Sequence, residues 1–244
     1  MENIFDTWLI KQPIAHRGLH DDTAPENSLA AFENAIKHGY AIELDVHMTR
    51  DGELVVFHDD SLDRMTDATG DLREKGFNEI FEITLKGSEE KIPLLSEVLK
   101  LVDGKVPLLI EVKDHKHIGI AEEKIKDALE NYHGKFALQS FNPFIVKWFK
   151  KNTDFTTGLL SCFFEGVPLA TINKILLKNL TFLRYTKADF VSYEYHAATT
   201  YKKIKKLKNK LPILFWTVPS QEEADKFKEY CDNIIFEGFL PKND

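Results

Sequence analysis

Three carboxylates and a lysine stand in a pattern that suits the binding of a divalent cation. Glu43 and Asp45 are two residues apart in one apolar run, and Glu111 and Lys113 are two apart in another. Residues two apart on a strand point to the same face. Buried carboxylates are costly unless they are paired or bind a metal, and three of them form an oxygen-ligand site for Ca²⁺ or Mg²⁺. The alternative is a salt-bridge cluster with Arg17 and Lys113, which spacing alone leaves open.

Two histidines stand at comparable positions. His16 and His58 each end an apolar run and precede a charged residue. Imidazole titrates near neutral pH, which suits general acid and base catalysis. One such histidine would more simply be a structural polar residue, but two of them beside three carboxylates indicate an acid/base pair.

Eight short apolar runs, most of them separated by helix-period stretches, determine the predicted fold. The runs are Pro13–His16, Ala41–His47, Val106–Lys113, Phe136–Phe141, Phe155–Cys162, Asp189–Tyr195, Pro212–Val218 and Asn233–Glu237. The helical stretches are Ser28–His38, Leu95–Val102, Gly119–Tyr132, Pro143–Lys151, Leu169–Leu183, Thr200–Leu211 and Gln221–Tyr230. Alternating strands and helices predict a parallel sheet. Eight repeats predict an α/β fold of the (β/α)₈ TIM-barrel class, with residues 1–244 as one catalytic domain and catalytic groups at the C-terminal ends of strands.

A ninth apolar run, Glu53–His58, does not fit this repeat. It follows the second strand through the segment Thr49-Arg50-Asp51-Gly52, and Asp-Gly between two extended runs favours a tight hairpin. The run is therefore predicted as an antiparallel return strand. A two-residue turn at Asp51-Gly52 would place Asp45 directly opposite His58, with both side chains on one face.

Turn and capping residues predict two further features. The interval after the return strand is polar and rich in turn residues, so about residues 59–94 are predicted as a small insertion between barrel strands two and three. Asn27 precedes the first long helix and is predicted as its N-cap, which would explain the Glu26-Asn27 pair structurally.

Composition excludes some functions and favours a location. The net charge of −7 makes the chain a poor candidate for binding nucleic acid or an anionic membrane. The N-terminus lacks a basic and then apolar signal pattern, and no apolar run approaches the roughly 18 residues of a membrane span. The two cysteines, Cys162 and Cys231, suggest neither a zinc site nor a disulfide framework. We expect a soluble, cytoplasmic protein without stable membrane insertion.

Several of these segments together resemble the signature of the glycerophosphodiester phosphodiesterases. The resemblance is carried by Ala15-His16-Arg17-Gly18, Pro25-Glu26-Asn27-Ser28, Glu43-Leu44-Asp45-Val46, Thr49-Arg50-Asp51-Gly52 and Val55-Val56-Phe57-His58-Asp59. It continues through Leu62-Asp63-Arg64, Ile92-Pro93, Ile110-Glu111-Val112-Lys113, Ser140-Phe141 and Phe215-Trp216-Thr217-Val218. It therefore spans nearly the whole chain, although Phe236-Glu237 stands where the family usually has Thr-Asp.

The resemblance implies a TIM barrel with an insertion after the second strand and a metal-dependent phosphodiesterase. It implies metal ligation by Glu43, Asp45 and Glu111, acid/base roles for His16 and His58, and phosphate contacts from Arg17 and Lys113. Trp216 and Phe141 could each be core residues, and the resemblance favours their contact with the substrate. The implied reaction is hydrolysis of a glycerophosphodiester to glycerol 3-phosphate and an alcohol.

Other functions stay open at this point. Paired carboxylates on a barrel also suit a glycosidase, but two histidines with Arg17 and Lys113 favour a phosphate substrate. A lysophospholipase D would need an apolar groove, for which the insertion offers several side chains: Leu62, Met65, Leu72, Phe77, Ile80, Phe81 and Ile83. A non-catalytic phospho-ligand-binding barrel would predict the loss of a catalytic residue, and none is missing. The alcohol, the preferred metal, the acid and base assignment and the oligomeric state do not follow from the sequence.

Overall fold

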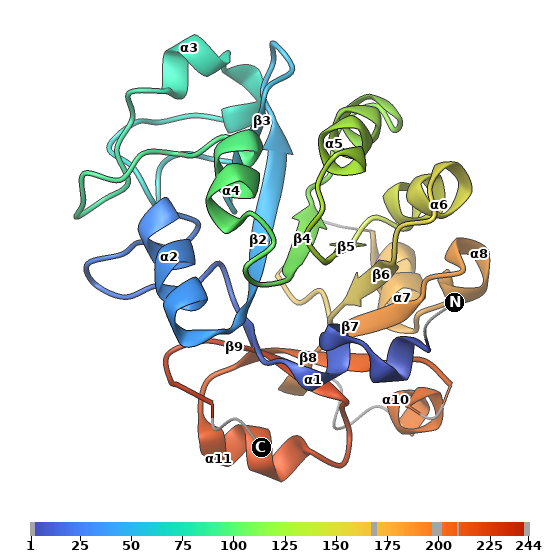
Figure 1. The fold of residues 1–244 in the computed structure, drawn as a ribbon. Helices are drawn as coiled ribbons and strands as arrows, with labels where there is room; N and C mark the ends of the chain where they lie inside the picture. The colour runs from blue at the N-terminus through green and yellow to red at the C-terminus, as the bar shows by residue number, and fades with distance from the viewer. Residues whose placement is uncertain (1–2, 167–169, 197–201, 209, 242–244) are drawn as a thin grey trace. The chain divides into compact units, whose positions relative to one another are not determined.

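The computed structural model describes residues 3–166, 170–196, 202–208 and 210–241 (Figure 1). The chain forms two compact units, one of residues Ala15–Phe136 and one of residues Met1–Ile14 with Ala137–Asp244. The expectation of one catalytic domain over residues 1–244 stays a prediction. In the described part of the chain, none of the helices has the length and apolar character needed to cross a membrane.

The unit Ala15–Phe136 is built around the long strand β2, Ala41–Met48. β2 pairs in parallel with β4, Leu108–Val112, and antiparallel with β3, Leu54–Val56. Its three longer helices are α2 (Leu29–His38), α4 (Leu95–Val102) and α5 (Ile120–Glu130). Figure 1 shows α2 and α4 beside β2, and both helices bury one apolar face. Strands buried in this way read as nearly continuous apolar runs, so the few charged residues within them stand out.

The predicted hairpin exists, but its predicted register is wrong by one residue. β3 runs antiparallel to β2 with Val46 opposite Val56 and Met48 opposite Leu54, and the Phe57 backbone N–H donates to the Asp45 carbonyl at 3.0 Å. Asp45 therefore faces Phe57 rather than His58. The loop has three residues because Thr49 pairs with Glu53, and Gly52 takes a φ of +91°. A three-residue loop that ends in a left-handed glycine is a common hairpin alternative to the two-residue turn.

The insertion forms a small core of its own. It contains the 3-10 helix η2 (Leu72–Glu74) and the one-turn helix α3 (Phe77–Ile80). Its buried apolar side chains pack with those of the return strand, and they are Val55, Phe57, Leu62, Leu72, Ile80, Leu85 and Ile92. Met65, Phe77 and Ile83 are partly buried against this cluster. Most of the apolar residues that could have formed a groove therefore stabilise the insertion itself.

The second unit repeats strand and helix in parallel order. Its strands are β5 (Phe136–Ser140), β6 (Thr157–Ser161), β7 (Phe190–Glu194), β8 (Ile213–Val218) and β9 (Asn233–Phe236), and each pairs in parallel with the next. Its helices are η1 (Ile4–Asp6), α1 (Trp8–Lys11), α6 (Pro143–Asn152), α7 (Thr171–Lys178), α8 (Leu183–Thr186), α10 (Lys202–Leu207) and α11 (Gln221–Phe227). Strand residues such as Tyr193 and Phe215 are fully buried in its core.

All eight predicted barrel runs contain an observed strand; the first is β1, Ile14–Ala15. The predicted helix Leu169–Leu183 is too long, because α7 ends at Lys178 and Leu180 takes a φ of +50° that no helix accommodates. The next helix, α8, begins only at Leu183. Leu169, Thr200 and Tyr201, at the ends of two predicted helices, lie outside the described residues.

Candidate active site

Three buried carboxylates converge because of the pairing between β2 and β4. Asp45 on β2 is the direct Cα partner of Glu111 on β4, so the two side chains lie on the same face. Glu43 is two residues before Asp45 and shares that face. One oxygen of each carboxylate lies within 4.8 Å of the other two, and all three side chains are buried. The structure thus brings the three predicted metal ligands together, and their role as ligands stays a prediction.

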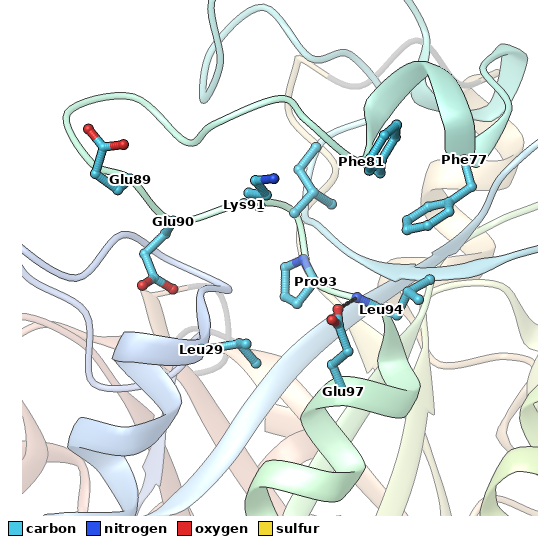
Figure 2. Close-up of a pocket in the computed structure, with 10 residues that line it drawn as sticks. Leu29, Phe77, Phe81, Glu89, Glu90, Lys91, Pro93, Leu94 and Glu97 are labelled. Carbon is cyan, nitrogen blue, oxygen red and sulfur yellow. Dashed lines mark hydrogen bonds between the residues drawn. The ribbon is translucent and has the colours of Figure 1, made fainter.

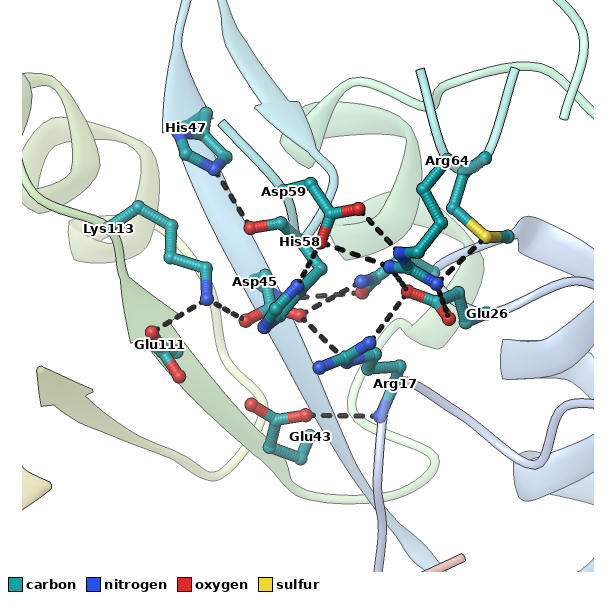
Figure 3. A network of polar contacts seen from close by, with 12 residues as sticks. Arg17, Glu26, Glu43, Asp45, His47, His58, Asp59, Arg64, Glu111 and Lys113 are labelled. Atoms are coloured by element: carbon teal, nitrogen blue, oxygen red, sulfur yellow. Dashed lines mark hydrogen bonds and ion pairs between the residues drawn. The ribbon is translucent and has the colours of Figure 1, made fainter. Parts of the chain in front are cut away.

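Two cations lie among these carboxylates (Figure 3). The Lys113 Nζ donates to Asp45 Oδ1 and to Glu111 Oε1, each at 2.8 Å. The Arg17 backbone N–H donates to Glu43 Oε2 at 3.0 Å, and the Arg17 Nε lies 3.6 Å from Asp45 Oδ2. The ion pairs of the alternative hypothesis are therefore present. Three carboxylates nevertheless face two cations, so one negative charge is uncompensated within this group, and an all-oxygen donor set of this charge fits a divalent cation.

The three acids differ in ionisation because their partners differ. Burial alone would raise the pKa of Asp45, but Lys113 and other nearby cations outweigh it and hold that pKa far below its usual value. Burial raises the pKa of Glu43 well above its usual value, and the charges of Asp45 and Glu111 add to this. Burial also raises the pKa of Glu111, which Lys113 only partly offsets. The ionised form of Glu43 thus has too little positive charge around it, and a bound cation would stabilise it.

The loop before α2 ties Arg17 to Asp45. Asn27 has a φ of +59°, and its backbone N–H donates to the Arg17 carbonyl at 2.9 Å. Its Nδ2 donates to Asp45 Oδ2 at 2.9 Å, and its Oδ1 accepts from the Asp45 backbone N–H at 3.3 Å. The prediction that Asn27 caps α2 is wrong, because Ser28 is the N-cap and accepts from the Ala31 N–H at 3.1 Å. Both residue types favour that position, so the sequence could not separate them.

Gly18 allows the chain to turn directly after Arg17. It has a φ of +81°, and a Cβ at this position would lie 2.9 Å from the Phe32 ring and 3.0 Å from the Ala31 backbone. We expect Gly18→Ala to lower the free energy of unfolding by about 2–4 kcal/mol, through backbone strain and overpacking together. Urea unfolding of wild type and variant would measure this difference in free energy.

Gly39→Ala is the matched control, since Gly39 has a φ of +72° and an added methyl group would meet nothing within 4 Å. In that variant, backbone strain alone should cost about 1 kcal/mol. Equal losses in the two variants would contradict the steric argument.

His58 lies just beyond β3 and is held by two contacts. Its carbonyl accepts from His47 Nε2 at 3.2 Å, and its Nδ1 lies 2.5 Å from Asp59 Oδ1. Burial would raise the pKa of Asp59, but hydrogen bonds from Arg64 and His58 outweigh it and lower that pKa to about 2. An ionised carboxylate only accepts hydrogen bonds. The Nδ1 of His58 therefore carries the proton, and Nε2 is the ring nitrogen that can accept one.

His16 directly follows β1 and is half-buried. The next residue, Arg17, has its backbone N–H fixed to Glu43, which anchors the chain at this point to the carboxylate group.

Burial lowers the pKa of His58, and it outweighs the negative charge of Asp45, which favours the protonated imidazole. The acid/base roles of both histidines stay predictions.

Four further residues hold this site, and the sequence reasoning assigned none of them such a role. His47 and Asp59 bind His58, while Glu26 and Arg64 belong to a network of ion pairs (Figure 3). Glu26, Asp59 and Arg64 lie within segments that carry the family resemblance, and that was the available signal. The contacts could not be inferred, because Arg64 and Glu26 are far apart in the sequence.

Comparison with known proteins identifies the family to which this chain belongs. Residues 16–161 match the model of the glycerophosphoryl diester phosphodiesterase family. The Bacillus subtilis (strain 168) protein YhdW, a glycerophosphodiester phosphodiesterase by provisional name, is 31% identical over 92% of this chain and 97% of its own length. The chain belongs to the glycerophosphoryl diester phosphodiesterase family. A glycerophosphodiester phosphodiesterase of Caldanaerobacter subterraneus subsp. tengcongensis is 38% identical over 57% of this chain and 61% of its own.

The solved structures of the family agree with the predicted fold class. A phosphodiesterase of Oleispira antarctica, solved in complex with the product sn-glycerol-3-phosphate, has a TM-score of 0.76 with 23% identity over 94% of this chain and 93% of its own. A likeness at this identity shows the fold, which is the predicted α/β TIM-barrel class with an insertion between the second and third barrel strands. The family match includes His16, Arg17, His58, the three carboxylates and Lys113.

Two aromatic residues predicted to contact the substrate lie in the second unit. The rings of Phe141 and Trp216 meet edge to face with centroids 5.6 Å apart, and Phe164 packs on Phe141 at 5.9 Å. The Trp216 Nε1 is buried and has no hydrogen-bond partner among the described residues. Because buried indole N–H groups usually have a partner, a polar ligand group would satisfy it. Of these residues, the family match covers Phe141 but ends before Phe164 and Trp216.

Proposed function

We propose that this chain is a metal-dependent glycerophosphodiester phosphodiesterase that hydrolyses its substrate to glycerol 3-phosphate and an alcohol. The observation that carries the proposal is the group of three buried carboxylates within 4.8 Å of one another, with Lys113 bound to two of them. Membership of the family and a structural neighbour with bound sn-glycerol-3-phosphate support the substrate class.

Glu43, Asp45 and Glu111 would hold the cation, which we expect to be Ca²⁺ or Mg²⁺. When bound, such a cation polarises a phosphoryl oxygen and neutralises charge that builds up on it. Lys113 and Arg17 supply further positive charge beside the carboxylates of β2 and β4. This charge would stabilise the pentacoordinate phosphorus of the transition state, which carries extra negative charge. Asn27 and Lys113 hold Asp45 in place through hydrogen bonds of 2.9 and 2.8 Å.

The two histidines would divide the proton transfers. With its Nδ1 proton donated to Asp59, neutral His58 presents Nε2 as a proton acceptor, which supports the role of general base toward the attacking hydroxyl or water. Burial lowers the pKa of His58, so the neutral form prevails at neutral pH. His16 would then protonate the departing alkoxide. Phe141 and Trp216 would contact the glycerol carbons or the leaving group.

A lysophospholipase D on the same chemistry is the second candidate, and the insertion bears on it. A cavity of about 490 Å³ lies against the insertion (Figure 2), and Phe77 and Phe81 are the only two of the seven apolar candidates in the insertion that line it. Its lining also includes Glu89, Glu90 and Glu97 but none of the predicted catalytic or metal-binding residues. Leu29, Ile92, Pro93 and Leu94 make most of the rest of its lining apolar. Because the cavity includes none of the residues expected to act on the phosphodiester, it offers no apolar surface at those residues themselves, which supports the smaller glycerophosphodiesters.

A substrate panel tests the proposal. We expect glycerol 3-phosphate to be released from glycerophosphodiesters with several alcohols, at rates at least about 10-fold above those on lysophospholipids that share the headgroups. An acyl chain needs an apolar site beside the reacting phosphodiester, and the lining of the cavity includes none of the predicted catalytic or metal-binding residues. A coupled enzymatic assay for glycerol 3-phosphate measures this. Faster turnover of the lysophospholipids would favour the lysophospholipase D, and turnover of neither class would favour a non-catalytic phospho-ligand-binding barrel.

The remaining expectations belong to this proposal. The small-molecule phosphodiester is the partner, and an acidic net charge of −7 speaks against nucleic acid and anionic membrane surfaces. A cytoplasmic location and a single catalytic domain are part of the same proposal, which leaves the oligomeric state open.

A further inference from the structure

Arg64, in the insertion, lies between two acids of the candidate active site. Its Nε donates to Asp59 Oδ2 at 2.5 Å, and its Nη2 donates to Asp59 Oδ1 at 3.1 Å. The same guanidinium donates to both Glu26 oxygens, from Nη1 at 2.8 Å and from Nη2 at 2.7 Å. Arg64 is thus bidentate to two carboxylates at once, which only the planar fork of an arginine can be.

The two acids differ in what else they bind. Glu26 also accepts from Arg17 Nη1 at 2.8 Å, so it would keep one cation if Arg64 were removed. Asp59 lies against Arg64 on one side and the His58 Nδ1 on the other (Figure 3). Removal of Arg64 would therefore disturb the orientation of the Asp59 carboxylate toward His58 far more than the orientation of the Glu26 carboxylate toward Arg17.

We infer that Arg64 is a positioning residue, which fixes Asp59 so that the imidazole of His58 stays in one orientation and in its Nδ1–H tautomer. The inference rests on the proposed function for its kinetic consequence, since it deepens the role of His58. It also gives the insertion a part in catalysis: Arg64 follows Leu62, which is buried in the core of the insertion, so the folding of this segment places the guanidinium. A carboxylate that orients a histidine through its far nitrogen is a recurrent catalytic arrangement.

Kinetics of Arg64→Gln and Asp59→Asn test this step. On a glycerophosphodiester, we expect each variant to lower kcat by about 10–100-fold, the usual effect of losing a group that orients a catalytic residue, and to change KM by less than about threefold. If Arg64 acts through Asp59, the double variant loses little more than Asp59→Asn alone. A double loss equal to the product of the single losses, or a higher KM at unchanged kcat, would show that Arg64 acts on the substrate directly and would overturn the inference.

Arg50→Gln is the matched control. Arg50 also anchors the insertion through its guanidinium, to the Glu74 carbonyl and to Glu79, each at 2.7 Å, but neither partner belongs to the candidate active site. Its loss should leave kcat within about twofold of wild type. If Arg50→Gln lost as much kcat as Arg64→Gln, the effect of Arg64 would be explained by its anchoring of the insertion, and the inference would fail.

A spectroscopic measurement separates this inference from the proposed function. The ¹⁵N chemical shifts of the His58 ring nitrogens report which of them carries the proton, whether or not the protein turns over a substrate. We expect the Nδ1–H tautomer in wild type and a mixture of tautomers in Arg64→Gln. Identical shifts in the two proteins would overturn the inference even if wild type is active. A wild type that hydrolyses no glycerophosphodiester but shows the tautomer change would refute the proposed function alone.

Discussion

Chelation of divalent cations is expected to abolish turnover, and adding back Ca²⁺ or Mg²⁺ to restore it. The reason is the charge imbalance in the site, where Lys113 and Arg17 are the two basic side chains among the described residues that pair with Glu43, Asp45 and Glu111. Without a cation, burial keeps the pKa of Glu43 well above its usual value, and the positive charge that would bind the phosphate is incomplete. Release of glycerol 3-phosphate before and after treatment with EDTA measures the effect. Full activity in the metal-stripped protein would make the carboxylates members of a structural ion-pair cluster.

Binding of the cation can also be measured without turnover. A ligand at about 100 times its Kd stabilises the folded state by about 2.7 kcal/mol, which for a chain of this length raises the Tm by roughly 5–10 °C. We expect this shift in wild type and its loss in Glu43→Gln. In the absence of metal, that variant should be at least as stable as wild type, since burial already disfavours the ionised form of Glu43 and a neutral amide places no charge in the interior.

Glu122→Gln is the control for the metal experiment. Glu122 is a further buried carboxylate of the same unit, and it accepts from the Gly119 N–H at 2.6 Å rather than joining the cluster. The variant should be less stable than wild type yet keep the whole metal-induced shift. If Glu43→Gln kept the shift as well, the cation would bind elsewhere and the proposed ligands would be wrong.

The strands and the convergence of the carboxylates could be predicted because each depends on short-range patterns. Apolar runs separated by helical stretches marked every strand, and the period of two along β2 placed Glu43 and Asp45 on one face. The neighbouring Glu111 followed from the rule that parallel barrel strands present their C-terminal ends together, and the register of β2 with β4 agrees.

What failed depends on choices between turns or caps of nearly equal energy. The length of the hairpin loop, two residues or three, depended on the conformation of Gly52. An error of one residue in that length changed the predicted partner of Asp45 from Phe57 to His58. The tie between Arg64, Glu26 and Asp59 is a tertiary contact made by an irregular insertion. No periodicity encodes such a contact, so only the family resemblance drew attention to those segments.

His16→Ala and His58→Ala are expected to lower kcat on a natural glycerophosphodiester by about 10²–10⁴-fold each. The substrate that separates their roles is a glycerol phosphodiester with a p-nitrophenol leaving group, because such a group departs without a proton. Loss of the general acid should then cost little, while loss of the general base should cost as much as before. From the Nδ1 contact of His58 with Asp59, we expect the activated substrate to rescue His16→Ala and not His58→Ala. Rescue of His58→Ala alone would reverse the assignment, and wild-type turnover of a natural substrate by either variant would remove that histidine from the mechanism.

The pH profile gives a second reading of the same assignment. A general base must be neutral to act, and the pKa of His58 is held below its ordinary 6.5, chiefly by burial. The kcat/KM of wild type should therefore rise with pH through a limb below about pH 6.5 and fall again at higher pH, where the general acid has lost its proton. His58→Ala should lack the rising limb. His38→Ala serves as control, because His38 is exposed on α2 and contacts the Asn34 carbonyl outside the site. A limb that survives in His58→Ala but disappears in His16→Ala would assign the base to His16, since the group that must lose its proton for activity is the one whose removal abolishes the limb.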